Sequence, residues 1–216
     1  MAIKLAVSVV HGTVIVMLTE PRGSRDALWR VAAEQRGYFT AAQALHTGYS
    51  YQAQHFHSQR GNWIKVDRGI YRFREYASFP GEPTDALVRW SLWSKGRAVV
   101  SHTTALAVHE LGTANPAEVH LTVPPGFRQR QSGAVLHKDT LSPEEIEQRE
   151  GFRVTTTTRA IVETAAAGGD QDIVDSAVNE LLVQGRTTAR RLLHAAQRLG
   201  PRAELEVERA VRADST

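Results

Sequence analysis

Residues 40–74 read TAAQALHTGYSYQAQHFHSQRGNWIKVDRGIYRFR, and this stretch decides the fold of the N-terminal part of the chain. Thr40 opens a capping-box pattern, with a glutamine three residues on, and predicts a helix over residues 41–45. A glycine ends that helix, and Ser50 then caps a second helix over residues 51–60. Two short helices separated by a tight turn are the centre of a helix-turn-helix.

The residues after these helices predict a β-hairpin with a basic outer face. Runs of β-forming residues flank a three-residue turn at residues 67–69, where a glycine supplies the positive φ that such a turn needs. Alternation predicts an apolar set that faces the core: Ile64, Val66, Tyr71 and Phe73. It predicts a basic set that faces outward: Lys65, Arg72 and Arg74. Arg68 lies at the tip.

The neighbouring residues complete the order of a winged helix-turn-helix domain. Apolar residues at helical spacing predict a helix over residues 26–36, and residues 38–39 predict a very short strand. Helix, short strand, helix, turn, helix and hairpin is the winged-helix order. We assign this domain to residues 21–79, and the PGEP sequence that follows predicts a boundary at residues 80–83.

The helix over residues 51–60 divides into two faces. Helical spacing places three residues on a stripe that faces the core: Ala53, Phe56 and His57. The other face carries hydrogen-bonding side chains, which is ordinary for a solvated helix, but here a basic hairpin follows directly. We therefore predict DNA contact through the helix and the hairpin, by nine residues: Tyr51, Gln52, His55, Ser58, Gln59, Lys65, Arg68, Arg72 and Arg74.

Basic residues are concentrated in the N-terminal part, although the formal net charge of the 216-residue chain is only +3. Residues 17–80 hold nine lysines and arginines against five acids, a net +4. Residues 81–216 hold sixteen against eighteen, a net −2. The asymmetry predicts that the first part meets a polyanion and that the second part has another role.

Residues 1–20 form an apolar extension that the winged-helix pattern does not include. No convincing signal-peptide cleavage site follows it, and its apolar run is too short and too interrupted to predict a membrane span. Two interpretations stay open. The extension is a β-strand rich in valine and isoleucine, or it is sequence upstream of a true start at Met17, which we favour.

Residues 84–216 predict a second, α+β domain with a small mixed sheet and a helical C-terminal tail. Strands are expected at four places: residues 97–101, 119–123, 134–137 and 152–155. Helices are expected over residues 85–95 and 103–111 and from Thr158 onward. The acidic residues 144–150 are assigned to a short helix capped by Ser142, because acids stabilise the first turn of a helix.

The sequence carries no recognisable catalytic or metal-binding motif. It has no cysteine, which excludes thiolate nucleophiles, thiolate zinc sites and disulfides. The patterns GxSxG, Walker A, GxGxxG and HExxH are missing. Nine histidines are scattered without metal-ligand spacing: His11, His46, His55, His57, His102, His109, His120, His137 and His194. We therefore expect no enzyme activity, no metal and no cofactor.

Two local interactions are expected in the second domain. Ser101 and His102 are adjacent in sequence, and adjacent residues do not form a catalytic dyad. We therefore assign Ser101 to capping the helix that begins near Thr103. Arg159 and Glu163 are four residues apart on a helix and are expected to pair across one turn.

Four stretches together resemble one known family. Residues 37–73 resemble the N-terminal winged-helix domain of AbiEi-type antitoxins of type IV toxin–antitoxin systems. VVSHTTALAVHELG, VHLTVP and GFRVTTTTRAIVETAAAG resemble the C-terminal antitoxin domain of that family, in the same order, so that the resemblance covers residues 24–185. Ala160 stands where a hydroxyl side chain is expected, and Glu163 where aspartate is commoner. A nuclease-like domain that some relatives carry after the helical region is not expected here.

The resemblance implies a cytoplasmic DNA-binding antitoxin that also represses its own operon. Its N-terminal domain would bind inverted repeats of double-stranded DNA in its own promoter, with two copies on one operator. Its C-terminal domain would neutralise a nucleotidyltransferase-like toxin encoded beside it, with direct contact left open. The alternative is a one-component winged-helix regulator whose C-terminal domain senses a small molecule. Neither interpretation involves a membrane.

Overall fold

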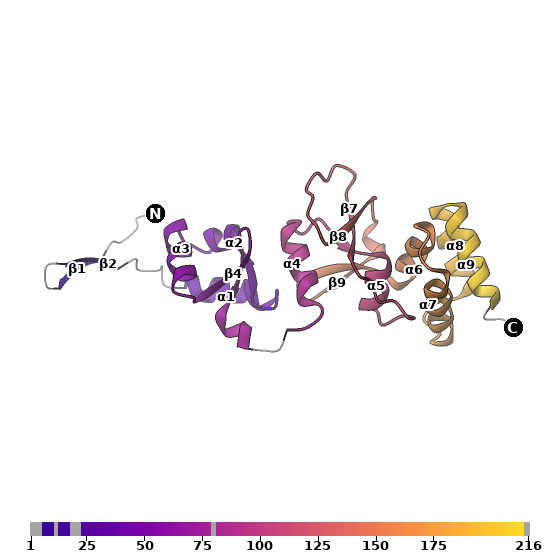
Figure 1. The fold of residues 1–216 in the computed structure, drawn as a ribbon, viewed down its shortest axis with the longest axis horizontal. Coiled ribbons are helices and arrows are strands. Elements are labelled where there is room, and N and C mark those ends of the chain that lie inside the picture. The colour runs from indigo at the N-terminus through magenta and orange to yellow at the C-terminus, as the bar shows by residue number, and fades with distance from the viewer. Residues whose placement is uncertain (1–5, 11–12, 18–22, 79–80, 214–216) are drawn as a thin grey trace. The chain divides into compact units, whose positions relative to one another are not determined.

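The computed structural model describes residues 6–10, 13–17, 23–78 and 81–213 (Figure 1). The chain has an α+β fold, as predicted, and divides into two compact units, unit 1 (residues 1–92) and unit 2 (residues 93–216). None of the helices in the described ranges is long and apolar enough to cross a membrane.

Unit 1 contains the elements of the predicted winged helix-turn-helix in the predicted order. The helices are α1 (Ser24–Ala33), α2 (Ala41–His46) and α3 (Tyr51–Gln59). The strands β3 (Tyr38–Thr40), β4 (Trp63–Asp67) and β5 (Ile70–Phe73) form an antiparallel sheet in the order β3-β5-β4. Both predicted caps form, because the Oγ atoms of Thr40 and Ser50 each accept a hydrogen bond from the backbone N–H three residues on, at 3.1 Å.

The core of unit 1 is built around aromatic rings. Phe39 of β3 is fully buried, and its ring centroid lies 4.8 Å from the centroids of both Trp63 and Phe73 in the wing. Leu28 and Ala32 of α1, both fully buried, belong to the same core. The hairpin of β4 and β5, which we call the wing, thus packs against α1 through Trp63 of β4 and Phe73 of β5.

The faces of β4 differ from the predicted alternation. Trp63 lies opposite Phe73, and Ile64 lies opposite Arg72, so that Trp63 rather than Ile64 faces the core. Trp63 is 2% exposed and Ile64 is 37% exposed. The prediction for Ile64 was wrong because it started the alternation one residue too late, although tryptophan offers more apolar surface to bury. Lys65, predicted to face outward, shares the core-side face with Tyr71 but is itself exposed.

The turn of the wing is shorter than predicted. Asp67 pairs with Ile70, which leaves Arg68 and Gly69 as a two-residue turn, and the register shifts between Lys65 and Asp67. Gly69 has φ 71°, the left-handed conformation expected for it. The shift is a β-bulge at Val66, where β4 has one residue more than β5. The turn is one residue shorter than predicted because this extra residue lies in the strand.

The boundary between the units falls later than the predicted one. The chain divides after Leu92, inside α4 (Asp85–Trp93), whereas the sequence placed this whole helix in the second domain. Asp85 explains the difference, because its carboxylate lies 3.2 Å from the Arg72 guanidinium and 3.6 Å from that of Arg36. These ion pairs join the first turn of α4 to unit 1. The short 3-10 helix η1 (Arg74–Ser78) lies between β5 and α4 in the sequence.

The apolar extension contains two strands that pair with each other. β1 (Ala6–Val10) and β2 (Thr13–Met17) form an antiparallel two-stranded sheet of their own. These residues are therefore extended, as the β-strand interpretation expected, but they form two strands instead of one. A start at Met17 stays a prediction, and the other residues of the extension lie outside the described ranges.

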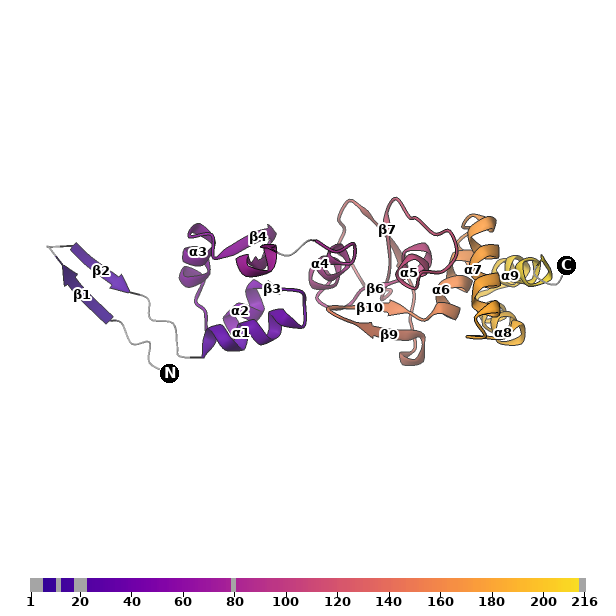
Figure 2. The same cartoon turned by 90° about the horizontal axis from the view of Figure 1, so that it is seen from below.

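Unit 2 holds a five-stranded mixed sheet in the order β8-β7-β6-β10-β9. The strands are β6 (Val99–Val100), β7 (Val119–Val123), β8 (Ala134–Lys138), β9 (Ile146–Arg149) and β10 (Phe152–Thr155). The helices are α5 (His102–Val108), α6 (Thr157–Ala166), α7 (Gln171–Val183), α8 (Ala189–Leu199) and α9 (Pro201–Ala213). Figure 2 shows α7, α8 and α9 grouped beside α6, and α9 packs against all three of its neighbours.

One strand of this sheet was assigned wrongly from the sequence. The acidic stretch predicted as a short helix forms only the 3-10 turn η2 (Pro143–Glu145) and then β9, which pairs with β10. β9 is an edge strand, where charged residues such as Glu147 and Arg149 remain partly exposed and pair with each other at 2.9 Å. Charged edge strands are common because they discourage further strand pairing.

Candidate nucleic-acid interface and polar clusters

α3 presents one continuous exposed face. Gln52, His55, Phe56 and Gln59 follow the i, i+3, i+4, i+7 spacing of one helical stripe, and all four are exposed. Tyr51, at the start of the helix, is 69% exposed. Four of the five predicted contact residues of this helix therefore lie on its exposed side, whereas Ser58 is half-buried.

Phe56 was wrongly assigned to the core, and Gln54 takes its place there. Phe56 is 46% exposed and Gln54 only 3%. The Gln54 side-chain N–H donates to the backbone carbonyl oxygens of Ala41 at 3.2 Å and Tyr49 at 3.4 Å, so its amide is satisfied inside the domain. Both partners are backbone carbonyl groups, so the pattern of polar and apolar residues in the sequence could not predict that Gln54 is buried. Phe56 joins the exposed face, where an aromatic ring can contact a thymine methyl group.

Replacing Gln54 with alanine is expected to destabilise unit 1 by about 1–2 kcal/mol, because two backbone carbonyl groups lose a buried donor. The exposed Gln52→Ala is the matched control and should change stability by less than about 0.5 kcal/mol. Urea unfolding followed by tryptophan fluorescence measures both. Equal effects of the two substitutions would contradict the structural role of Gln54.

The wing and the end of α3 carry exposed cations. Arg68 at the turn, Lys65, Arg74 and Arg60 are all exposed. Among the described residues, no carboxylate lies within ion-pair distance of any of them. Arg60 lies over the Phe56 ring, with 5.2 Å from its guanidinium carbon to the ring centroid. Arg74 also donates from Nε to the carbonyl oxygen of Gly61 and keeps its two terminal nitrogens for a phosphate, whereas Arg68, Lys65 and Arg60 offer their whole charged groups.

Arg72 does not belong to this set, although it lies, as predicted, on the face of β5 opposite Tyr71 and Phe73. Its side chain is only 14% exposed, and its guanidinium lies 3.2 Å from the Asp85 carboxylate. The same group donates to the carbonyl oxygen of Arg36 at 3.3 Å and lies 4.7 Å from the centroid of the Tyr38 ring. An arginine held on three sides serves the packing of unit 1, which argues against the predicted DNA contact.

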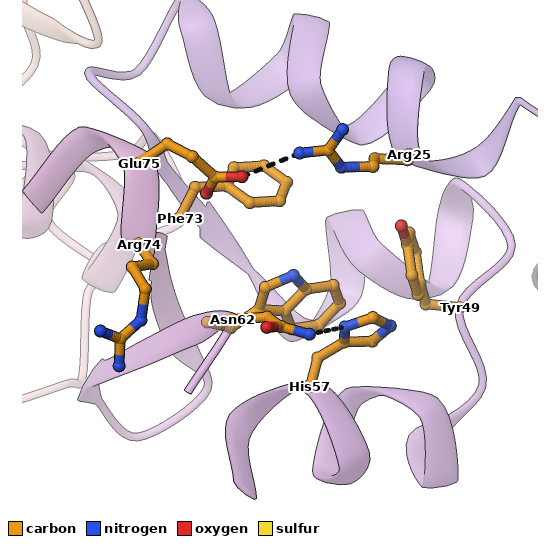
Figure 3. A pocket seen from close by; sticks show the side chains of 8 residues that line it. Arg25, Tyr49, His57, Asn62, Phe73, Arg74 and Glu75 are labelled. Carbon is orange, nitrogen blue, oxygen red and sulfur yellow. Dashed lines mark hydrogen bonds and ion pairs between the residues drawn. The ribbon is translucent and has the colours of Figure 1, made fainter. Parts of the chain in front are cut away.

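A pocket of about 380 Å³ adjoins the inner side of α3 (Figure 3). Its wall is aromatic, and the His57 ring stacks on Trp63 with 4.9 Å between ring centroids. The ion pair between Arg25 and Glu75, at 2.8 Å, crosses one side of it. A molecule bound here would touch α3 through His57 and leave the exposed face of the helix uncovered.

In unit 2, Arg159 is the centre of a buried network of charges. Its Nε lies 2.9 Å from the Glu163 carboxylate, which confirms the predicted pair across one turn of α6. The guanidinium also pairs with Glu145 at 3.0 Å and with Asp139. Arg159 is 7% exposed and Glu163 3%. Burial raises the pKa of Glu163, and the charge of Arg159 opposes that rise.

Three histidines that are distant in sequence meet beside this network. His102 begins α5 after β6, His120 lies on β7 and His137 on β8, and these three strands are neighbours in the sheet. One ring nitrogen from each of the three lies within 4.8 Å of the others. Sequence spacing could not reveal this cluster, because the parallel pairing of β7 with β8 brings it together.

Ser101 has a different partner from the predicted one. It occupies the N-cap position of α5 but makes no side-chain capping bond. Its Oγ instead lies 2.9 Å from Nδ1 of His102, a residue with the unusual φ of 53°. The strained backbone and this hydrogen bond together fix the orientation of the His102 ring.

All three rings of the cluster are neutral at neutral pH. Burial, with a smaller effect of the neighbouring His137 and His120, lowers the pKa of His102 to about 3. Burial likewise lowers the pKa of His137 to about 4 and shifts that of His120 in the same direction. Each ring therefore keeps one nitrogen lone pair that can accept a hydrogen bond or bind a metal ion.

Comparisons with known proteins support the fold without showing a family. No family model and no curated protein matches the sequence. Among solved structures, the chain is similar to the RV2827C protein from Mycobacterium tuberculosis, with a TM-score of 0.58 and 14% sequence identity over 91% of this chain and 78% of that one. At this identity the likeness concerns the α+β architecture alone.

Proposed function

We propose that unit 1 binds double-stranded DNA through the exposed face of α3 and the cations of the wing. The observation that carries this proposal is the stripe of Gln52, His55, Phe56 and Gln59, exposed on a capped helix that a cationic hairpin follows. Glutamine can bind adenine through two hydrogen bonds, and exposed arginines bind phosphates or enter a narrow minor groove. One such helix covers one half-site, so we expect two copies on an inverted repeat.

We further propose that the whole chain is an antitoxin of the AbiEi type that represses its own operon in the cytoplasm. Support for this step comes from the sequence resemblance in residues 24–185, and unit 2 would neutralise a nucleotidyltransferase-like toxin. The proposal assigns no enzyme activity to the chain. The runner-up is a one-component regulator that senses a small molecule.

Combined replacement of Arg68 and Arg74 by alanine is expected to weaken binding to all DNA sequences alike. Loss of two phosphate contacts should reduce the slope of log affinity against log salt by about 2. Gln52→Ala should instead change the preference between operator and mutated operator by about 1–3 kcal/mol at one base position. Fluorescence anisotropy with DNA from directly upstream of the gene, over a series of salt concentrations, measures both.

Arg89→Ala is the charge control for this experiment, because Arg89 is exposed on α4, outside the helix-turn-helix and the wing. It should leave the salt slope unchanged. Absence of any binding to the upstream DNA at low salt would refute the proposed DNA contact.

Co-expression separates the antitoxin from the ligand sensor. An antitoxin restores growth when the adjacent toxin gene is induced, whereas a ligand-sensing regulator does not. Growth that stays arrested, in cells with the folded chain present, would refute the antitoxin proposal and leave the DNA-binding proposal intact.

A further inference from the structure

We propose that His102, His120 and His137 form a binding site for a divalent transition-metal ion of the Zn²⁺ type. Three imidazole nitrogens that leave a fourth position open to water are an established zinc environment. Here one nitrogen from each of three rings lies within 4.8 Å of the other two. The site belongs to unit 2 and does not depend on the DNA contacts proposed for unit 1.

The spacing of two of these nitrogens is already close to that of metal ligands. Zn–N bonds of about 2.0–2.1 Å in a tetrahedral site place two ligand nitrogens about 3.3 Å apart. Nδ1 of His120 and Nε2 of His137 are 3.0 Å apart and share a hydrogen bond. When an ion replaces that bond, the donating ring shifts its proton to its other nitrogen through solvent. Neutral imidazoles then bind the ion and no net proton is released.

The third ligand is oriented by groups around it. Nδ1 of His102 lies 2.9 Å from Oγ of Ser101 and 3.9 Å from the Glu163 carboxylate, which leaves Nε2 to bind the ion. Metal-binding histidines usually donate their second N–H to a nearby oxygen in this way. Ser101 and Glu163 are therefore positioning residues for His102.

One rearrangement is required before an ion can bind. The rings of His102 and His137 are stacked, with 3.5 Å between their centroids and 18° between their planes. The two rings have to tilt apart so that their nitrogens converge on one ion, while Nε2 of His137 stays beside Nδ1 of His120. His137 lies on the edge strand β8 and is half-buried, as is His120, so this side of the cluster is partly open to solvent and gives the ion a path in.

The test is a Zn²⁺ titration of the full chain, without a histidine tag, in competition with a chromophoric chelator. The wild-type chain should bind one ion per chain, and Co²⁺ should give the visible absorption of a four-coordinate site. His137→Ala should weaken Zn²⁺ affinity by at least ~100-fold, since even changes to residues behind a ligand cost ~10–100-fold. Zn²⁺ should also raise the unfolding temperature of the wild-type chain but not that of the variant.

His194→Ala is the matched control, because His194 is exposed on α8, outside the cluster, and should bind Zn²⁺ as the wild type does. Circular dichroism checks that each variant is folded, and His120→Gln replaces His137→Ala in the experiment if the latter is not. The proposal is overturned if the wild-type chain takes up no Zn²⁺, or if the folded cluster variant binds it as tightly as the wild type.

Discussion

Replacing Arg159 with alanine is expected to lower the free energy of unfolding of unit 2 by about 3–5 kcal/mol. The guanidinium is buried and pairs with three carboxylates, of Glu163, Glu145 and Asp139. Without it, the described residues of the unit leave the Glu163 carboxyl group, which is 3% exposed, without a lysine or arginine partner. Burial of an unpaired charge is far more costly than loss of an ion pair in water. Urea unfolding followed by the helical circular dichroism signal measures the change.

Two further variants test whether the loss of stability comes from the unpaired buried charge, or whether removal of any arginine that contacts these carboxylates has the same effect. Arg198 reaches the same Glu145 carboxylate at 3.8 Å, but its side chain is 62% exposed, so Arg198→Ala should cost less than about 1 kcal/mol. The double replacement of Arg159 and Glu163 by methionine removes both charges and should recover part of the loss. If Arg159→Ala costs no more than Arg198→Ala, the buried pair does not stabilise unit 2.

Replacing Phe39 with alanine is expected to destabilise unit 1 by about 3–5 kcal/mol. Phe39 is fully buried, and its ring contacts the wing through Trp63, Phe73 and Tyr71, at centroid distances of 4.8, 4.8 and 5.9 Å. The substitution leaves a cavity where β3, β4 and β5 meet. Tryptophan fluorescence during urea unfolding reports the loss directly, because Trp63 lies against the substituted ring.

Phe56→Ala is the control for this prediction, since it is the same change in the same unit at a residue that is 46% exposed. It should cost less than about 1 kcal/mol of stability. It should nevertheless weaken binding to upstream DNA, if Phe56 touches the bases as proposed. Similar losses of stability for the two variants would mean that Phe39 is not the centre of the core.

Features set by neighbouring residues could be predicted closely from the sequence. The strands over residues 119–123 and 152–155 have the bounds that were predicted for them. The caps at Thr40 and Ser50 also form as expected, because capping depends on residues three apart. The positive φ of Gly69 follows from its place in a tight turn, again a local requirement.

Features that depend on distant partners were mispredicted. Arg72 is held by Asp85. Phe56, predicted in the core, is exposed, while Gln54, which had no assignment, is buried by carbonyl groups of α2 and of the turn before α3. β9 forms a strand because β10 pairs with it, although its own residues favour a capped helix start. In each case the free energy of a tertiary contact outweighs a local preference of a few tenths to about 1 kcal/mol.

The sequence by itself determined the winged-helix order, the positions of the caps and most of the exposed face of α3, because helical periodicity and capping act within a few residues. Only the tertiary structure decided which cations stay exposed, that Phe56 and not Gln54 lies on the surface, and that three histidines meet. Those outcomes depend on which strands become neighbours and which side chains find partners across the fold, and periodicity carries no information about either.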